Sequence, residues 1–86
     1  MSHGVSTDEA AVLTKVTEIF RDVFDDDSIV LRDNMTARDV PGWDSLANVR
    51  LMLSIEQAWG FQFSLTEISE LRNVGDLLIA IRNRAS

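Results

Sequence analysis

The chain has 86 residues, of which 45% are hydrophobic and 26% are charged, and its formal net charge is −6. This length allows one small globular domain with a single modest core. The acidic balance argues against nucleic-acid binding, which needs clustered Lys and Arg, and the absence of cysteine excludes a disulfide framework, a thiolate metal site and a cysteine nucleophile.

The N-terminal residues carry no sequence pattern. Residues 1–5 lack the basic and apolar regions of a secretory signal, and no apolar run approaches the roughly 18 residues that a membrane span needs. The single histidine, His3, lies in this stretch and is assigned no role. We therefore expect a monomeric cytoplasmic protein with a short tail, residues 1–5, and one domain, residues 6–86.

A first helix is predicted from a capping box, Ser6-x-x-Glu9, to about Phe24. Its apolar residues recur with the 3.6-residue period of one helix face. Three consecutive aspartates, Asp25 to Asp27, should end this helix, because the helix dipole disfavours negative charge at a C-terminus. They do not fit a calcium loop, which would need an oxygen ligand where Ile29 stands.

A long loop from Ser28 to Trp43 has no sustained period and ends in the turn signal Pro41-Gly42. Loops of this length in small domains are usually functional, or else the assignment of a loop is wrong. Asp44 or Ser45 should then cap a second helix that ends at Gly60. This helix is apolar around much of its circumference, which predicts either a partner surface or ligand cleft, or a helix that is buried on two sides.

Two further helices complete the predicted fold. A second capping box, Ser64-x-x-Glu67, predicts a short helix to about Leu71, and Asn73 should cap a last helix. One or both of the rings of Phe61 and Phe63, on the connector before the short helix, are expected to fill the core. The predicted fold class is therefore all-α: a four-helix bundle with a short third helix and a long loop between helices 1 and 2.

Catalytic constellations are missing from the sequence. A serine nucleophile needs a base within hydrogen-bond reach, and His3 lies in the tail. Ser45, at the start of the second helix, should expose its hydroxyl, and a phosphate esterified to it would lie at the positive end of the helix dipole. Asp44 would repel that phosphate. The alternative is that Asp44-Ser45 is only a helix cap.

The chain resembles the acyl carrier protein family in several features taken together. These are the tripeptide Asp44-Ser45-Leu46, its place after a long loop and before the second of four helices, the length of the chain and its acidity. The resemblance runs from about Thr7 to Arg84. It includes two later stretches, Ile55-Glu56-Gln57-Ala58-Trp59-Gly60-Phe61 and Val74-Gly75-Asp76-Leu77.

This resemblance implies a carrier protein and no enzyme of its own. A phosphopantetheinyl transferase would move 4'-phosphopantetheine from coenzyme A, with magnesium, onto Ser45, and the arm would hold acyl groups as thioesters for acyl-loading and acyl-transferring enzymes. Asp44 would belong to the signature that the transferase reads. Leu46 and Leu53 would be apolar contacts for partner enzymes, and Leu71 would line the cleft for an acyl chain. No metal site in the protein is implied.

The sequence departs from fatty-acid-synthesis carriers, which usually have acids two, five, eleven and twelve residues after the serine. Here only Glu56 is acidic; the others are Ala47, Arg50 and Gln57. Arg50 is unfavourable for a basic partner patch, unless it is merely a solvated residue. We therefore expect a specialised carrier for a secondary-metabolite or polysaccharide pathway. The alternatives are a peptidyl or aminoacyl carrier, and a helical interaction adaptor that is never modified.

Overall fold

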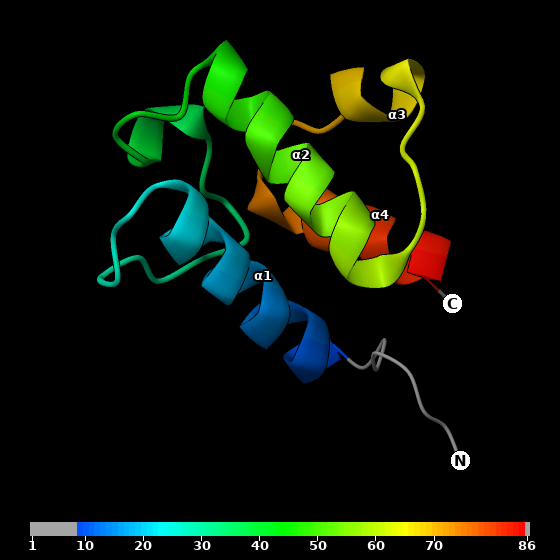
Figure 1. Cartoon of the computed structure of the whole chain (residues 1–86), viewed down its shortest axis with the longest axis horizontal. Coiled ribbons are helices and arrows are strands. Elements are labelled where there is room, and N and C mark those ends of the chain that lie inside the picture. The colour runs from blue at the N-terminus through cyan, green and yellow to red at the C-terminus, as the bar shows by residue number, and fades with distance from the viewer. Residues whose placement is uncertain (1–8, 86) are drawn as a thin grey trace.

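The computed structural model describes residues 9–85 and contains the predicted helices in the predicted order. Four α-helices and one short 3-10 helix make up the regular structure of this range, which contains no strand (Figure 1). Their bounds are α1, Glu9–Val23; η1, Ala37–Asp39; α2, Ser45–Trp59; α3, Leu65–Ser69; and α4, Val74–Ala85. The all-α prediction is confirmed. The predicted tail and Ser6 of the first capping box lie outside the described residues.

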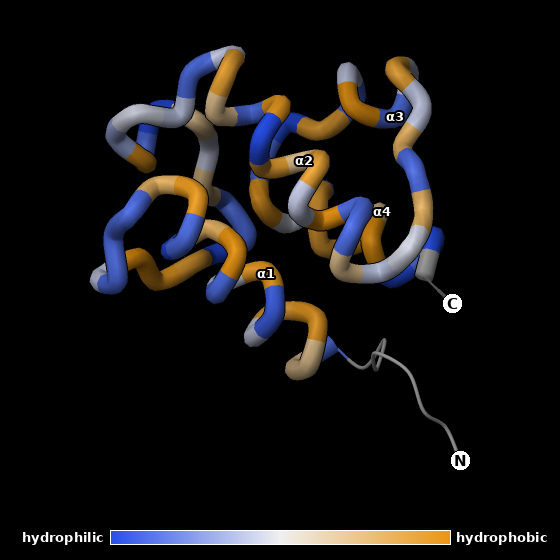
Figure 2. Tube along the Cα trace, viewed as in Figure 1, coloured by the Kyte–Doolittle hydropathy of each residue, from blue (hydrophilic) through white to orange (hydrophobic). Residues whose placement is uncertain are grey.

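The core lies where α1 packs against α2 and α4 (Figure 1). Apolar and polar residues alternate along these helices (Figure 2), so that each helix buries one face and exposes another. None of the helices within residues 9–85 is both long and apolar enough to span a membrane. The fully buried side chains of the core are Val12, Val16, Phe20, Leu51, Ile55, Val74, Leu77 and Ile81.

The two long helices α1 and α2 end in left-handed caps. After α1, Asp25 adopts φ 51° and the Asp26 amide donates to the Arg21 carbonyl (3.0 Å), the bond of a Schellman motif. After α2, Gly60 adopts φ 75° and its amide donates to the Glu56 carbonyl (2.8 Å). The aspartate run therefore ends the first helix as predicted, although through backbone geometry that glycine usually supplies.

The long loop between α1 and α2 packs against the bundle. Its apolar residues are buried and join the core: Ile29, Leu31, Met35 and Val40. Its backbone also caps α4, because the carbonyls of Asp33 and Met35 accept from the amides of Gly75 (2.8 Å) and Val74 (2.9 Å). A Cβ on Gly75 would lie 3.1 Å from the Asp33 oxygen, a tight contact that a larger residue could make only if the loop backbone shifted by a few tenths of an ångström. The loop thereby holds the start of α4 in place.

Two local features differ from the sequence-based expectation. The loop contains η1, which is closed by a capping box between Thr36 and Asp39 that the sequence analysis did not identify. Helix α3 ends at Ser69 and not near Leu71, since the chain must leave the helix before Asn73 can cap α4. Leu71 therefore belongs to the turn between α3 and α4.

Candidate functional site

Ser45 is the first residue of α2 and lies at the surface. The preceding residue, Asp44, is extended (φ −105°, ψ −171°) and is the N-cap. Its Oδ1 accepts a hydrogen bond from the Ala47 amide (2.8 Å). Within residues 9–85 the Ser45 hydroxyl has no hydrogen-bond partner. Of the two possible caps, Asp44 therefore has this role, and the Ser45 hydroxyl is available for other chemistry.

Trp43 fixes the chain just before Ser45. Its ring meets the Phe20 ring edge-on, with centroids 5.2 Å apart, and lies 6.0 Å from the Phe24 ring. Its indole Nε1 donates to Oδ1 of Asn48 (3.0 Å), one turn into α2. The end of the loop is thus held both to α1 and to α2, and the start of α2 cannot shift relative to the core without breaking these contacts.

A cavity of about 380 Å³ opens beside Ser45. Apolar side chains from α2, α3 and α4 line part of it: Met52, Ile68 and Leu77, together with Leu71 from the turn after α3. Polar side chains also line it: Asp44, Ser45, Asn48, Arg72 and Asn73. Ser45, Asp44 and Leu71, which the sequence analysis singled out separately, therefore meet at one cavity. The place of Asn48, Arg72 and Asn73 at this cavity was not predicted: Asn73 was expected only as a helix cap, and no local pattern marks Asn48 or Arg72.

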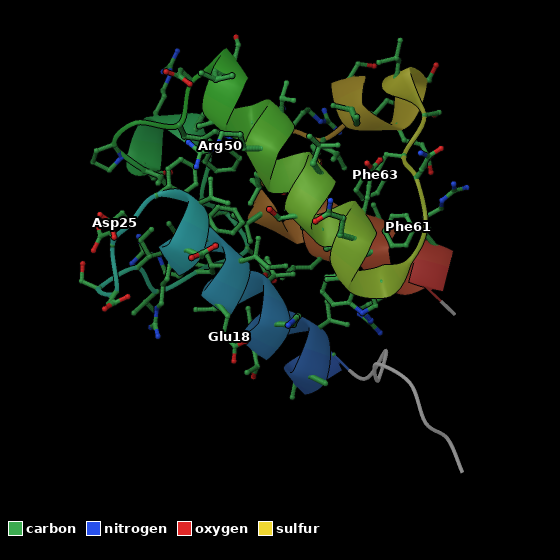
Figure 3. All side chains as sticks on the ribbon, viewed as in Figure 1. Glu18, Asp25, Arg50, Phe61 and Phe63 are labelled. Atoms are coloured by element: carbon green, nitrogen blue, oxygen red, sulfur yellow. The ribbon has the colours of Figure 1, made fainter. Side chains whose placement is uncertain are left out.

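The outward face of α2 lies apart from this cavity. Leu46, Val49 and Leu53 are 69%, 54% and 52% exposed, and they form a stripe along the helix. Arg50 is exposed on the same helix (Figure 3). The surplus apolar residues of α2 are thus at the surface, and the alternative that α2 is buried on two sides is wrong. Leu46 and Leu53 were predicted as partner contacts, and Val49 is a third exposed apolar residue on this face, which was not predicted.

Helix α3 forms one wall of the cavity, and polar contacts fix its first turn. Ser64 and Glu67 form the predicted capping box, in which the Ser64 amide donates to Glu67 Oε1 (2.8 Å). This hydrogen bond, with a smaller contribution from the positive charge of Arg84, lowers the pKa of Glu67 below its ordinary 4.5. Arg84 also donates to the Gln62 carbonyl and lies over the Phe61 ring, 5.9 Å from its centroid. Arg84 thus ties the end of α4 to the segment that leads into α3.

The comparisons with known proteins agree with this arrangement. The chain matches a solved NMR structure of a holo acyl carrier protein from Geobacter metallireducens with 44% sequence identity and a TM-score of 0.80. The match covers 84% of this chain and 83% of that protein. No family model matches the chain, and neither does any curated protein. Identity at this level over most of both chains shows that this chain belongs to the acyl carrier protein family, a family of carriers and not of enzymes.

Proposed function

We propose that the chain carries acyl groups as thioesters on a 4'-phosphopantetheine arm attached to Ser45. The observation that carries this proposal is the position of Ser45: an exposed residue with a hydroxyl free of protein hydrogen bonds, at the start of α2 and on the wall of a cavity. The arm supplies a terminal thiol, which the chain itself lacks because it contains no cysteine.

The residues around Ser45 fit such a group. A phosphate on Ser45 would lie at the N-terminus of α2, where an anion is favoured by about 0.3–1 kcal/mol. The Asp44 carboxylate would oppose it, but one of its oxygens is already engaged by the Ala47 amide. The cavity, at about 380 Å³, is within the usual size of small-molecule sites. We infer that its apolar wall, which includes Leu71, shelters part of the acyl chain.

Partner enzymes should recognise α2. In this proposal a phosphopantetheinyl transferase reads Asp44 together with Ser45, and the enzymes that load and transfer acyl groups contact the exposed Leu46 and Leu53. Arg50 places a positive charge on this face (Figure 3). Because a basic enzyme patch would be repelled there, we propose a specialised pathway, for a secondary metabolite or a polysaccharide, in preference to housekeeping fatty acid synthesis.

Domain organisation and cargo belong to the same proposal. We propose that residues 6–86 form a single carrier domain, since α1, α2 and α4 share one core. A peptidyl or aminoacyl carrier would use the same Ser45 chemistry and differ in the enzyme that loads the arm. An unmodified adaptor is the remaining candidate, and the exposed stripe of Leu46, Val49 and Leu53 is the observation that favours it.

The intact mass tests the attachment site. The protein is incubated with coenzyme A, magnesium and a broad-specificity phosphopantetheinyl transferase, and we expect a gain of one phosphopantetheine. Ser45→Ala should gain nothing, whereas Ser54→Ala, a second serine of α2 that does not line the cavity, should be loaded like the wild type. No gain in the wild type with an active control transferase, or loading of Ser45→Ala, would refute the proposal.

A charge reversal tests the pathway. The protein that carries the phosphopantetheine arm is incubated with a fatty-acid-synthesis malonyltransferase, and the rate of malonyl transfer to the arm is measured. Arg50→Glu should react on the order of fivefold faster than the wild type, since an exposed ion pair contributes up to about 1 kcal/mol. Arg38→Glu makes the same charge change on η1 and should have no comparable effect. Equal rates for the wild type and Arg50→Glu would leave the specialised pathway without its main support.

A further inference from the structure

Two side-chain amides line the cavity beside Ser45, Asn48 from α2 and Asn73 from the cap of α4. An asparagine side chain carries one acceptor oxygen and an NH₂ group with two donor hydrogens. Asn48 Oδ1 accepts from the Trp43 indole Nε1 (3.0 Å), and an indole N–H can only donate. The orientation of the Asn48 amide is therefore settled by chemistry, and its NH₂ group must lie on the side away from the indole.

The amide of Asn73 is fixed in the same way. Its Oδ1 accepts from the backbone N–H of Asp76 (2.8 Å), which again can only donate. Within residues 9–85, neither Asn48 nor Asn73 has a partner for its Nδ2, and neither Nδ2 is a buried atom. Both NH₂ groups are thus accessible donors on residues that line the same cavity.

The other polar side chains of the cavity add a further hydrogen-bond donor but no free neutral acceptor apart from Ser45. Arg72 can only donate, and its ion pair with Asp76 is long (3.8 Å) and exposed, so it restrains Arg72 weakly. The acceptors are Asp44, which caps α2, and Ser45, which is the proposed attachment site. A purely alkyl chain in this cavity would cover Asn48 and Asn73 without giving their donors a partner, which is unfavourable.

We propose that the NH₂ groups of Asn48 and Asn73 bind the keto oxygen of a carried acyl chain, so that the cavity favours keto acyl chains over plain alkyl chains. The inference rests on the proposed attachment at Ser45. The same NH₂ groups could instead donate hydrogen bonds to an amide carbonyl oxygen of the arm itself. Both sources offer the same chemistry, a carbonyl oxygen within reach of the cavity, and the experiment separates them.

The experiment compares three forms of the ¹⁵N-labelled protein, in which Ser45 carries the bare arm, an octanoyl arm or a 3-oxooctanoyl arm, each confirmed by intact mass. The side-chain NH₂ resonances of Asn48 and Asn73 and the melting temperature are measured. We expect the 3-oxooctanoyl form to shift these resonances, and to melt about 4–8 °C above the octanoyl form, the effect of one hydrogen bond in a domain of this size.

Aspartate variants remove the donors and keep the structural acceptors. Asn48→Asp can still accept from the Trp43 indole, and Asn73→Asp can still cap α4, but neither retains an NH₂ group. Each should reduce the difference in melting temperature between the 3-oxooctanoyl and octanoyl forms. Asn34→Asp adds the same charge in the exposed part of the loop, outside the cavity, and should leave the difference unchanged.

Each outcome decides the question. Equal shifts in all three loaded forms, relative to the unmodified protein, would assign the bound oxygen to the arm and overturn the preference for keto acyl chains. Unmoved NH₂ resonances in every form, or an equal effect of Asn34→Asp, would overturn the inference while the mass gain on Ser45 leaves the carrier function standing. No loading of Ser45 would overturn both.

Discussion

The two tryptophans differ in the fate of their indole N–H, and this predicts opposite responses to the same substitution. Trp43 Nε1 donates to Asn48 Oδ1 (3.0 Å), whereas Trp59 Nε1 is buried without a partner among the described residues. Trp→Phe at either position removes the indole N–H together with two ring carbons. We expect Trp43→Phe to destabilise the protein clearly and Trp59→Phe to be nearly neutral or stabilising.

The magnitudes follow from the hydrogen bonds. At Trp43 the substitution removes a bond worth about 1 kcal/mol and leaves Asn48 Oδ1 without its donor, in a half-buried position, so a loss of about 1–2 kcal/mol is expected. At Trp59 it removes a buried unpaired donor, whose desolvation costs about 1–3 kcal/mol. The two missing ring carbons cost about 1 kcal/mol or less at each half-buried site. The two variants should therefore differ by at least about 1 kcal/mol.

Urea unfolding followed by far-UV circular dichroism measures this difference, since fluorescence would change with the loss of either tryptophan. For 86 residues the total stability is expected to be about 4–13 kcal/mol, so a difference of 1 kcal/mol is measurable. Equal m-values are required for the comparison. If Trp59→Phe destabilises as much as Trp43→Phe, the role assigned to the indole of Trp43 in holding the start of α2 is wrong.

Two further predictions concern carboxylates. The folded protein holds the pKa of Glu67 below 4.5, mainly through the Ser64 amide, so the ionised Glu67 stabilises the fold fully above its unfolded pKa, and this stabilisation is lost as the pH falls through the lower folded pKa. Between about pH 6 and 3, the urea midpoint of Glu67→Gln should therefore fall less steeply than that of the wild type or of the control Glu70→Gln. Parallel curves would contradict this. Asp44→Asn keeps the cap acceptor, so its free energy of unfolding should lie within about 0.5 kcal/mol of the wild-type value, whereas Asp44→Ala should lose about 1 kcal/mol. If the transferase reads the charge of Asp44, mass analysis should show that both variants gain the arm more slowly. Loading of Asp44→Asn at the wild-type rate would show that Asp44 acts only as a helix cap.

The elements that local chemistry determines were predictable from the sequence. Ser64-x-x-Glu67 forms its capping box, Gly60 ends α2 in the left-handed region, and Asn73 caps α4. In each case the signal lies within four residues of the feature, and the side chain that forms the contact is the one that the pattern names. Such features need no knowledge of the tertiary structure, which is why the helix order and the short α3 followed directly.

The cavity was only partly predictable, because its walls come from distant parts of the chain. Asn48 and Asn73 lie 25 positions apart and meet at one cavity only because the loop carbonyls of Asp33 and Met35 hold the start of α4. Neither asparagine belongs to a periodic pattern. The bond from Trp43 to Asn48 spans five residues across a loop and a helix turn, and no sequence rule distinguishes it from a solvated Asn. Contacts of this kind depend on packing that periodicity alone does not specify.

The order of Asp44 and Ser45 is itself informative about function. A helix cap needs one acceptor, and either residue could supply it. Because Asp44 accepts from the Ala47 amide, the cap is complete before the helix reaches Ser45, and the hydroxyl is exposed with no protein partner among the described residues. With the two residues exchanged, serine would cap the helix and its oxygen would be occupied by a backbone amide. The observed order therefore leaves the cap to Asp44 and the hydroxyl of Ser45 accessible, which is what the proposed attachment at Ser45 requires.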